Sequence, residues 1–424
     1  MYTEQEQKEY MKVWFSLAEE AGRNGFTWPS LLEKEEWNQY MATGMYRMPV
    51  NTYTAISKAT EEIMYVLYRT YQFIVNTTED FQKLGFPPET WEIARMKHTG
   101  LFSYFTRFDF IVNGDDIKLI EVNCDTPTGY LEPSVANEVL CRYHDVHHPN
   151  HIEEHIVQAW EQIKHDYNIG PAETIYFTSY DWHDEDRQTV QFLRSYCLNH
   201  PTEYVGIQDI VVADDGIYTP SGEKIKYLYR LYPIEYLVSD VNKNGKRIGL
   251  QFLDHIAQGR VKIINPPAAF LMQNKSVLAL IWQLFEEEVF FEKDEREIIK
   301  NYFLPTYFTN KPFLERNESY VSKPLYGREG GGVSIYDNEE LLAEDKTEYY
   351  FEQRKIYQQY IEMPDYTIDT WDGPYTGKLL IGSHCISGRA AGLFLRVGEK
   401  ITGNLSMFTG VTIEGQSKQR AHQK

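Results

Sequence analysis

Two short stretches of alternating apolar and polar residues predict a hairpin in the first third of the chain. Residues 106–112 and 117–123 alternate as half-buried strands do. Asn113-Gly114-Asp115, between them, has the residue types of a tight turn. The pattern therefore predicts two antiparallel strands with one apolar and one polar face.

Four charged or amide residues fall on the polar face of this hairpin, because strand side chains alternate between two faces. A loop of residues 114–116 places Asp109 opposite Glu121 and Arg107 opposite Asn123. Two carboxylates and an amide oxygen are hard donors of the kind that Mg²⁺ takes, and Mg²⁺ needs few ligands from protein. The spacing indicates a magnesium site; an ordinary salt-bridged hairpin is the alternative.

The remaining periodicity predicts helices first and mixed structure afterwards. Residues 1–95 are mainly helical in pattern, with the longest apolar-periodic run at 53–75. A further helix is expected at 130–143. Residues 174–265 alternate strand-like and helix-like segments, which is the pattern of an α/β lobe.

An acidic pair, Glu185 and Asp186, stands where a predicted strand of this lobe passes into a helix. Strand ends that face a helix start are common ligand sites in α/β sheets. Acidic residues in a first helical turn also complement the helix dipole without binding anything. Both interpretations stay open from the residues alone.

A strand, a glycine-rich loop and a second strand are predicted between residues 320 and 333. Glycines let a backbone approach phosphate groups closely and donate N–H groups to them. The loop is neither a Walker A loop nor a Gly-x-Gly-x-x-Gly loop. Further on, the pattern predicts a hairpin of residues 378–386 and 390–397. Its second strand carries Arg396 among Leu and Phe residues. A buried arginine on a strand usually has a carboxylate or phosphate partner.

Composition narrows the possible partners. The 424 residues include 62 acidic and 42 basic side chains, a net charge of −20, which argues against nucleic acid and suits a cationic substrate. The chain starts without a signal-peptide pattern and has no apolar run of about 18 residues. Its four cysteines are scattered, so a reducing, cytoplasmic location without a membrane partner is expected.

One short motif points elsewhere. His151-Ile-Glu-Glu-His155 has the HxxEH pattern of inverted zincins, and both histidines would share a helix face. Pro149-Asn150 just upstream places the motif in the first turn of a helix. A solvated helix face is therefore favoured, and a zinc hydrolase that uses His151 and His155 is the alternative.

Taken in chain order, the motifs resemble the glutathionylspermidine synthetase family of ATP-grasp carbon–nitrogen ligases. The resemblance runs from about residue 95 to 410. The matching segments are Arg107-x-Asp109, Glu121-x-Asn123-x-Asp125-Thr-Pro-Thr with Glu132 after it, Lys323-Pro-Leu-x-Gly-Arg-Glu-Gly, Tyr357-Gln-x-Tyr360 and Gly392-x₃-Arg396. It implies a mixed α/β protein with an ATP-grasp fold, a preceding Rossmann-like lobe and a helical N-terminal segment.

The resemblance implies the cofactors ATP and Mg²⁺ and a role for the hairpin residues. Asp109, Glu121 and Asn123 would hold Mg²⁺, while Arg107 would face the phosphates. Arg396 would bind the γ-phosphate or an acyl phosphate in the transition state.

The remaining implied contacts concern the nucleotide and the amine. Glu185 and Asp186 would receive the amines of a polyamine. The implied nucleotide contacts are Lys275, Lys323, Gly327, Arg328, Gly330, Gly331, Gln358, Gln359 and Tyr360. The last three lie on a strand, residues 355–361, that would lead into the backbone segment that hydrogen-bonds adenine.

The expected organisation is a helical segment at 1–95, the hairpin with an α/β lobe at 96–268 and the ATP-grasp region at 269–424. The expected activity joins a glutathione-like carboxylate to an amine such as spermidine through an acyl phosphate, with only small molecules as partners. The amidase half that bifunctional family members carry is not expected. A nucleotide-binding protein of the same fold that has no ligase turnover is the alternative.

Overall fold

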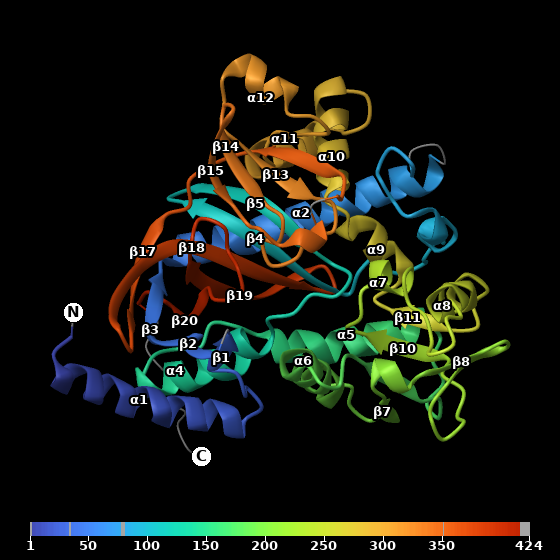
Figure 1. Ribbon diagram of the computed structural model, residues 1–424, viewed down its shortest axis with the longest axis horizontal. Helices are drawn as coiled ribbons and strands as arrows, with labels where there is room; N and C mark the ends of the chain where they lie inside the picture. Colours follow the sequence, from blue (N-terminus) through green and yellow to red (C-terminus); the bar gives the residue numbers. More distant parts are fainter. Residues whose placement is uncertain (1, 34, 78–80, 351, 416–424) are drawn as a thin grey trace.

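The computed structural model describes residues 2–33, 35–77, 81–350 and 352–415 of the protein. Figure 1 shows three sheet-containing parts: the C-terminal lobe at the top, a large curved sheet in the middle, and an α/β lobe at the lower right. The large sheet has strand order β3-β20-β19-β18-β4-β5, with β17 paired to β18 outside this path. Its strands are β3 (Met41–Met48), β4 (Phe105–Asn113), β5 (Asp116–Asn123), β17 (Asp365–Thr370), β18 (Gly373–Ile386), β19 (Arg389–Gly398) and β20 (Met407–Ile413).

The predicted long helix is α2 (Val50–Asn76), which packs on β18 and β19. Ile56, Ile63, Leu67 and Ile74 recur at helical spacing along it and are all buried. This apolar stripe covers one face of the large sheet, so the strands that carry the site residues rest on a packed core.

The α/β lobe that the alternating pattern predicted has four parallel strands in the order β11-β10-β6-β7. The strands are β6 (Ile175–Thr178), β7 (Thr202–Tyr204), β10 (Tyr227–Arg230) and β11 (Lys262–Ile264). The helices are α5 (Ile152–Asp166), α6 (Asp184–Ser195), α7 (Ile234–Leu237) and α8 (Ile248–Ala257), and β8 (Val211–Ala213) with β9 (Gly216–Tyr218) forms a side hairpin.

The C-terminal lobe has a five-stranded sheet in the order β12-β16-β13-β14-β15. The strands are β12 (Thr306–Tyr307), β13 (Tyr320–Pro324), β14 (Ser334–Asp337), β15 (Glu340–Glu344) and β16 (Lys355–Gln359). The helices of this part are α9 (Pro267–Gln273), α10 (Ser276–Glu287), α11 (Lys293–Tyr302) and α12 (Lys311–Arg316). The glycine-rich loop joins β13 to β14, as predicted.

The N-terminal segment is less helical than its pattern indicated. Besides α1 (Glu4–Arg23), α2 and α3 (Trp91–Ala94), it contains β1 (Ser30–Glu33), β2 (Glu36–Gln39) and β3. Strand β3 pairs in parallel with β20, more than 360 residues away, a contact that local periodicity cannot report. The large sheet takes strands from all three expected segments. The boundaries at residues 95 and 268 therefore do not coincide with separate sheets, and as domain boundaries they stay predictions.

The hairpin β4–β5 has the predicted cross-strand pairs but reaches them by a different route. Asn113 pairs with Asp116, so the loop has two residues rather than three, and Gly114 takes φ +62°. A bulge then leaves Ile120 as an extra residue between the pairs Phe110–Leu119 and Asp109–Glu121. The bulge restores the register, so Arg107 still faces Asn123.

The helix expected at 130–143 is present in two parts. A π-helix, η2 (Glu132–Ala136), leads directly into α4 (Asn137–Tyr143). π-helical turns are rare and often lie at functional sites. Glu132, the first residue of this turn, lines the cavity described below.

Candidate active site

A cavity of about 570 Å³ lies among the large sheet, the α/β lobe and the C-terminal lobe. Most of the residues singled out from the sequence line it. They are Arg107, Glu121, Asn123, Glu185, Asp186, Lys275, Lys323, Gly327, Arg328, Gly330, Gln358, Gln359, Tyr360 and Arg396. Of the remaining two, Asp109 contacts the lining residues Arg107 and Arg396, and Gly331 lies in the loop that closes one side.

Asp109 holds two arginines at one end of the cavity. Arg107 Nε donates to Asp109 Oδ1 at 2.9 Å and Arg107 Nη2 donates to Oδ2 at 3.2 Å. Arg396 Nη2 donates to the same Oδ2 at 3.3 Å from β19. Asp109 is 1% exposed, so the three charges form a largely buried cluster. A carboxylate or phosphate partner was predicted for Arg396, and in this structure it contacts the carboxylate of Asp109.

Glu121 gathers the two lysines. Lys275 Nζ lies 2.8 Å from Glu121 Oε1 and also donates to the carbonyl of Gly327 at 2.7 Å. Burial raises the pKa of Glu121, but Lys275, Lys323 and Arg107 outweigh it and lower the pKa to about 2. Burial in turn lowers the pKa of Lys323 to about 8, against the attraction of Glu121.

The polar face of the hairpin fits the magnesium ion implied by the family. Asp109, Glu121 and Asn123 present two carboxylates and one amide from paired strands. The Asn123 amide nitrogen is buried and has no hydrogen-bond partner among the described residues. This NH₂ group is a donor and needs an acceptor such as a phosphate oxygen, while the amide oxygen is the atom that could bind Mg²⁺. Only oxygen donors are needed, which matches Mg²⁺ rather than a softer metal.

The glycine-rich loop is tied to the α/β lobe by Arg328. Arg328 Nη2 donates to Glu235 Oε1 on α7 at 2.9 Å, and Nη1 donates to Thr126 Oγ1 at 3.0 Å. Gly330 has φ +73°, and a Cβ there would lie 2.9 Å from the carbonyl oxygen of Thr402. Glycine is therefore required at this position by both the backbone conformation and the neighbouring chain.

The strand proposed to meet adenine has part of its hydrogen-bonding capacity already in use. Gln358 is 2% exposed, and its Oε1 accepts from Lys323 Nζ at 2.7 Å, so its side chain positions the lysine. The N–H of Gln359 donates to Pro305 and the N–H of Tyr360 donates to Ser319. Adenine contacts from this strand would therefore have to use its carbonyl groups or the residues that follow.

Four acidic residues also line the cavity: Glu185 and Asp186 on α6, Glu329 in the glycine-rich loop and Glu132 on η2. Asp186 contacts the His183 ring at 3.3 Å, at the capped start of α6. Burial, and then the charges of Glu132 and Glu329, raise the pKa of Glu185 to about 8. The cavity thus has a cationic end at the hairpin and an acidic end at α6.

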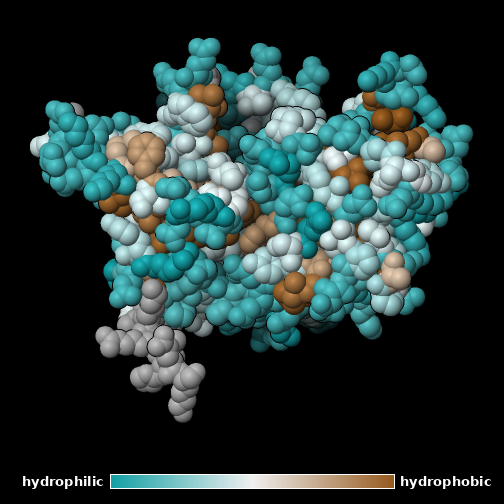
Figure 2. All heavy atoms as spheres, turned by 90° about the horizontal axis from the view of Figure 1, so that it is seen from below, coloured by the Kyte–Doolittle hydropathy of each residue, from teal (hydrophilic) through white to brown (hydrophobic). Residues whose placement is uncertain are grey.

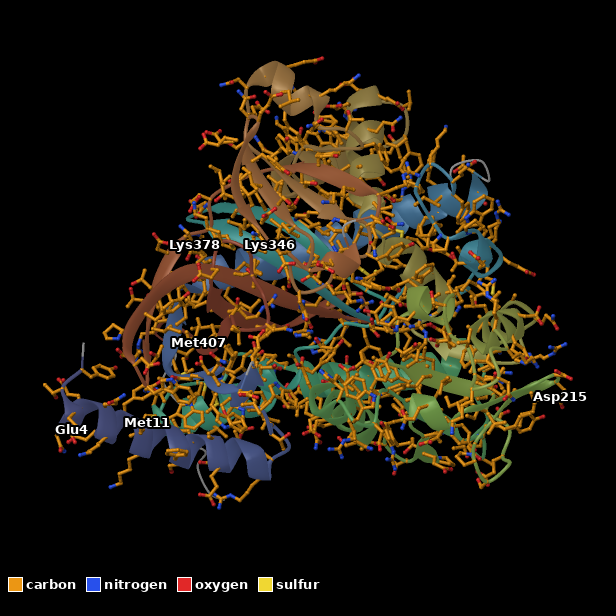
Figure 3. The ribbon with its side chains drawn as sticks, in the orientation of Figure 1. Glu4, Met11, Asp215, Lys346, Lys378 and Met407 are labelled. Carbon is orange, nitrogen blue, oxygen red and sulfur yellow. The ribbon has the colours of Figure 1, made fainter. Side chains whose placement is uncertain are left out.

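This shift predicts a pH-dependent stability. Between pH 4.5 and about 8, the folded protein keeps the Glu185 proton that the unfolded chain releases, so the free energy of unfolding falls as the pH rises. We expect Glu185→Gln to make this fall smaller, measured by urea unfolding at several pH values in that window. Asp215→Asn, at the outer end of the same lobe (Figure 3), is the control. An unchanged slope in Glu185→Gln would show that Glu185 is ionised in the folded protein.

Several residues that support the site were missed from the sequence. Asn265 Oδ1 accepts from the N–H groups of Tyr104 and Phe105, and its Nδ2 donates to the carbonyls of Cys124 and Asp125. The side chain thus joins the start of β4 to the end of β5. No local motif marks such a residue, because its partners lie about 140 to 160 residues away along the chain.

Two further residues that support the site, Arg230 and His384, could have been singled out from their residue type. Arg230 ends the apolar strand β10 and is 1% exposed, and its Nη2 lies 2.5 Å from Asp125 Oδ1. His384 Nε2 donates to the carbonyl of Gly129 at 2.7 Å. Burial, and then Arg107, lower the pKa of His384 to about 3, so the ring is neutral. A charged or titratable residue inside an apolar strand was the available signal in both cases.

The HxxEH histidines lie outside this cavity. His151 precedes α5 as its N-cap and is exposed, and His155 Nδ1 donates to the carbonyl of His151 at 2.7 Å. Within the described ranges, no three His, Cys, Asp or Glu side chains are grouped so that they could hold a metal. The zinc alternative therefore lacks a third ligand in this part of the chain.

Two further surface features bear on the expected partners. None of the described helices is long and apolar enough to cross a membrane. The face seen in Figure 2 is mainly hydrophilic, with apolar side chains in small separate groups.

Comparison with known proteins identifies the family and the relatives of the chain. A family model described as glutathionylspermidine synthase preATP-grasp matches residues 9–414. A putative acid–amine ligase of Haemophilus influenzae is 27% identical over 321 residues, covering 72% of this chain and 73% of that protein. The bifunctional glutathionylspermidine synthetase/amidase of Escherichia coli is 24% identical over 152 residues, which span 36% of this chain and 21% of that protein. A glutathione synthetase-like effector of Globodera pallida, solved in its apo form, superposes with a TM-score of 0.59 at 10% identity, covering 95% of this chain and 96% of that one.

The fold is therefore the mixed α/β fold of glutathione synthetase-like ATP-grasp proteins, as predicted. The extent of the family match identifies the group within this class. The chain belongs to the glutathionylspermidine synthase preATP-grasp family, and the expected class of enzyme, a carbon–nitrogen ligase, is confirmed.

Proposed function

We propose that the protein joins a peptide-like carboxylate to an amine in a reaction driven by ATP and dependent on Mg²⁺. The observation that carries this proposal is the opposite charge of the two ends of one cavity. Arg107, Arg396 and two lysines surround the hairpin carboxylates, and acidic residues face them from α6 and η2. The first end suits phosphate groups, and the second suits a cationic amine.

The cationic end would activate the carboxylate. Arg107 and Arg396 are fixed by Asp109, and they would stabilise the charge that develops as the substrate carboxylate attacks the γ-phosphate. Lys323, positioned by Gln358, would meet the nucleotide phosphates. Mg²⁺, held by Asp109, Glu121 and Asn123, would neutralise phosphate charge when it is bound with ATP. The products of this first step are ADP and an acyl phosphate.

The second step needs orientation and exclusion of water rather than a protein nucleophile. The amine would displace phosphate from the acyl group and form the amide, with Glu185 and Asp186 near the substrate cation. An acyl phosphate hydrolyses in water, so the loop carrying Arg328, held across the cavity by Glu235, would protect it. Glutathione and spermidine are the proposed substrates, since the family is named for their product.

The test is Mg²⁺-dependent release of ADP with glutathione and spermidine added separately and together. We expect release only with both, and a loss of at least about 100-fold in Asn123→Ala and Arg396→Ala. Arg389→Ala is the matched control, because Arg389 is exposed at the other end of β19. ATP binding without turnover on a broad panel of carboxylates and amines would instead indicate a binding protein. A protein that does not bind ATP would overturn the proposal.

A further inference from the structure

One carboxylate in the cavity is more deeply buried than the others and is only half satisfied. Glu132 is 1% exposed, at the start of the π-helix η2. Its Oε1 accepts from Trp28 Nε1 at 3.2 Å and from the Tyr40 hydroxyl at 2.9 Å. Its Oε2 is buried and has no hydrogen-bond partner among the residues that the structure describes. A buried carboxylate oxygen without a donor is costly unless a ligand supplies one.

Glu132 interacts with both the cationic and the acidic groups of the cavity. Arg107 stabilises its charge from the cationic side. On the acidic side, the charge of Glu132 raises the pKa of Glu185 more than any other neighbouring charge does. Tyr40, from the turn before β3, is the third ionisable group that faces it. A group that interacts with both sets of charges stands where an amine held by the acidic end would approach an acyl phosphate held by the cationic end.

We infer that Glu132 accepts a proton from the substrate ammonium and so produces the neutral amine that attacks the acyl phosphate. The inference rests on the proposed function and assigns a residue to its second step. The free Oε2 is the accepting atom, while Trp28 and Tyr40 hold the other oxygen in place. Burial raises the pKa of Glu132 and makes it a better base than an exposed carboxylate, against the opposing hydrogen bonds from Tyr40 and Trp28.

The step balances without a further reactant. The ammonium gives one proton to Glu132 and becomes a neutral amine. The amine nitrogen then forms a bond with the acyl carbon, and the bond between this carbon and the phosphate oxygen breaks. The oxygen leaves with the electron pair as inorganic phosphate, which takes the second amine proton. Glu132 returns its proton to solvent after the product leaves.

The decisive experiment replaces the amine by hydroxylamine, which is largely unprotonated at neutral pH and needs no base. Wild type and Glu132→Gln are each given ATP, Mg²⁺ and glutathione, with either spermidine or hydroxylamine. We expect Glu132→Gln to lower amide formation with spermidine by at least about 100-fold. Formation of the glutathione hydroxamate should continue, which would also show that the variant is folded and activates the carboxylate.

Tyr40→Phe provides a second readout that keeps the carboxylate. Loss of one hydrogen bond to Oε1 disfavours the charged form, so the acidic limb of the pH–rate profile should move to higher pH with spermidine and stay in place with hydroxylamine. If Glu132→Gln lost the reactions with spermidine and with hydroxylamine equally, Glu132 would have only a structural role and the inference would be overturned. Normal amide formation with spermidine in Glu132→Gln would also overturn it. Absence of hydroxamate with wild type would instead refute the proposed function.

Discussion

Replacing Asp109 with asparagine is expected to lower kcat/KM for the ATP-dependent ligation by at least about a thousandfold. The substitution keeps the shape of the side chain and removes its charge. Arg107 and Arg396 would then lose the carboxylate that both contact, and the proposed magnesium site would lose one of its two anionic ligands. The measurements are steady-state kinetics and the dependence of the rate on Mg²⁺ concentration.

Asp116→Asn is the control for this prediction. Asp116 lies at the turn of the same hairpin, its side chain is 59% exposed, and its contact with Lys118 is 3.4 Å long. An exposed ion pair of this kind contributes little to stability, and Asp116 lies outside the cavity lining, so Asp116→Asn is expected to keep wild-type kinetics. If Asp109→Asn kept the wild-type rate and Mg²⁺ dependence, neither the metal site nor the arrangement of the two arginines proposed here would hold.

The largest effect on stability is expected from Arg230→Met. Arg230 and Asp125 are each about 1% exposed, and their two hydrogen bonds measure 2.5 and 3.1 Å. Removing the arginine leaves a buried carboxylate without its counterion, which typically costs about 3–5 kcal/mol. We expect the urea midpoint of unfolding to fall accordingly, followed by circular dichroism.

Two further variants separate charge from packing in this result. Arg187→Met removes an arginine of the same lobe whose ion pair with Asp184 is exposed, and it should cost less than about 1 kcal/mol. Arg230→Met combined with Asp125→Asn removes both charges and should recover part of the lost stability. A double variant no more stable than Arg230→Met would show that packing of the arginine, not its charge, stabilises this junction.

The hairpin shows how far local pattern extends. Alternation on two strands was sufficient to place Asp109 and Glu121 on one face, because side chains on a strand alternate between faces. Their pairing was predicted from a three-residue loop, and the structure reaches the same pair with a shorter loop. The two-residue turn and the bulge at Ile120 were not predicted, since each compensates for the other in the register. The glycine-rich loop between two strands was likewise readable from residue types, and its binding of phosphate stays a prediction.

Residues that act through distant partners were not readable. Glu132 belongs to the family motif, but no role was predicted for it, and Glu235 stands in a segment without a distinctive local motif. Each contacts a side chain about 90 residues away along the chain. Strand β3 was likewise missed, because its pairing partner β20 lies at the opposite end of the chain.

By itself, the sequence determined most element types after residue 95, the polar face of the hairpin and the family, since these depend on side-chain periodicity and on residue types at short spacing. Only the tertiary structure decided which charges meet. It paired Asp109 with both arginines, Glu121 with Lys275 and Arg328 with Glu235, and it left one oxygen of Glu132 without a partner in the described chain. The physical reason is that burial and ion pairing depend on distances across sheets and lobes, and no local pattern contains those distances.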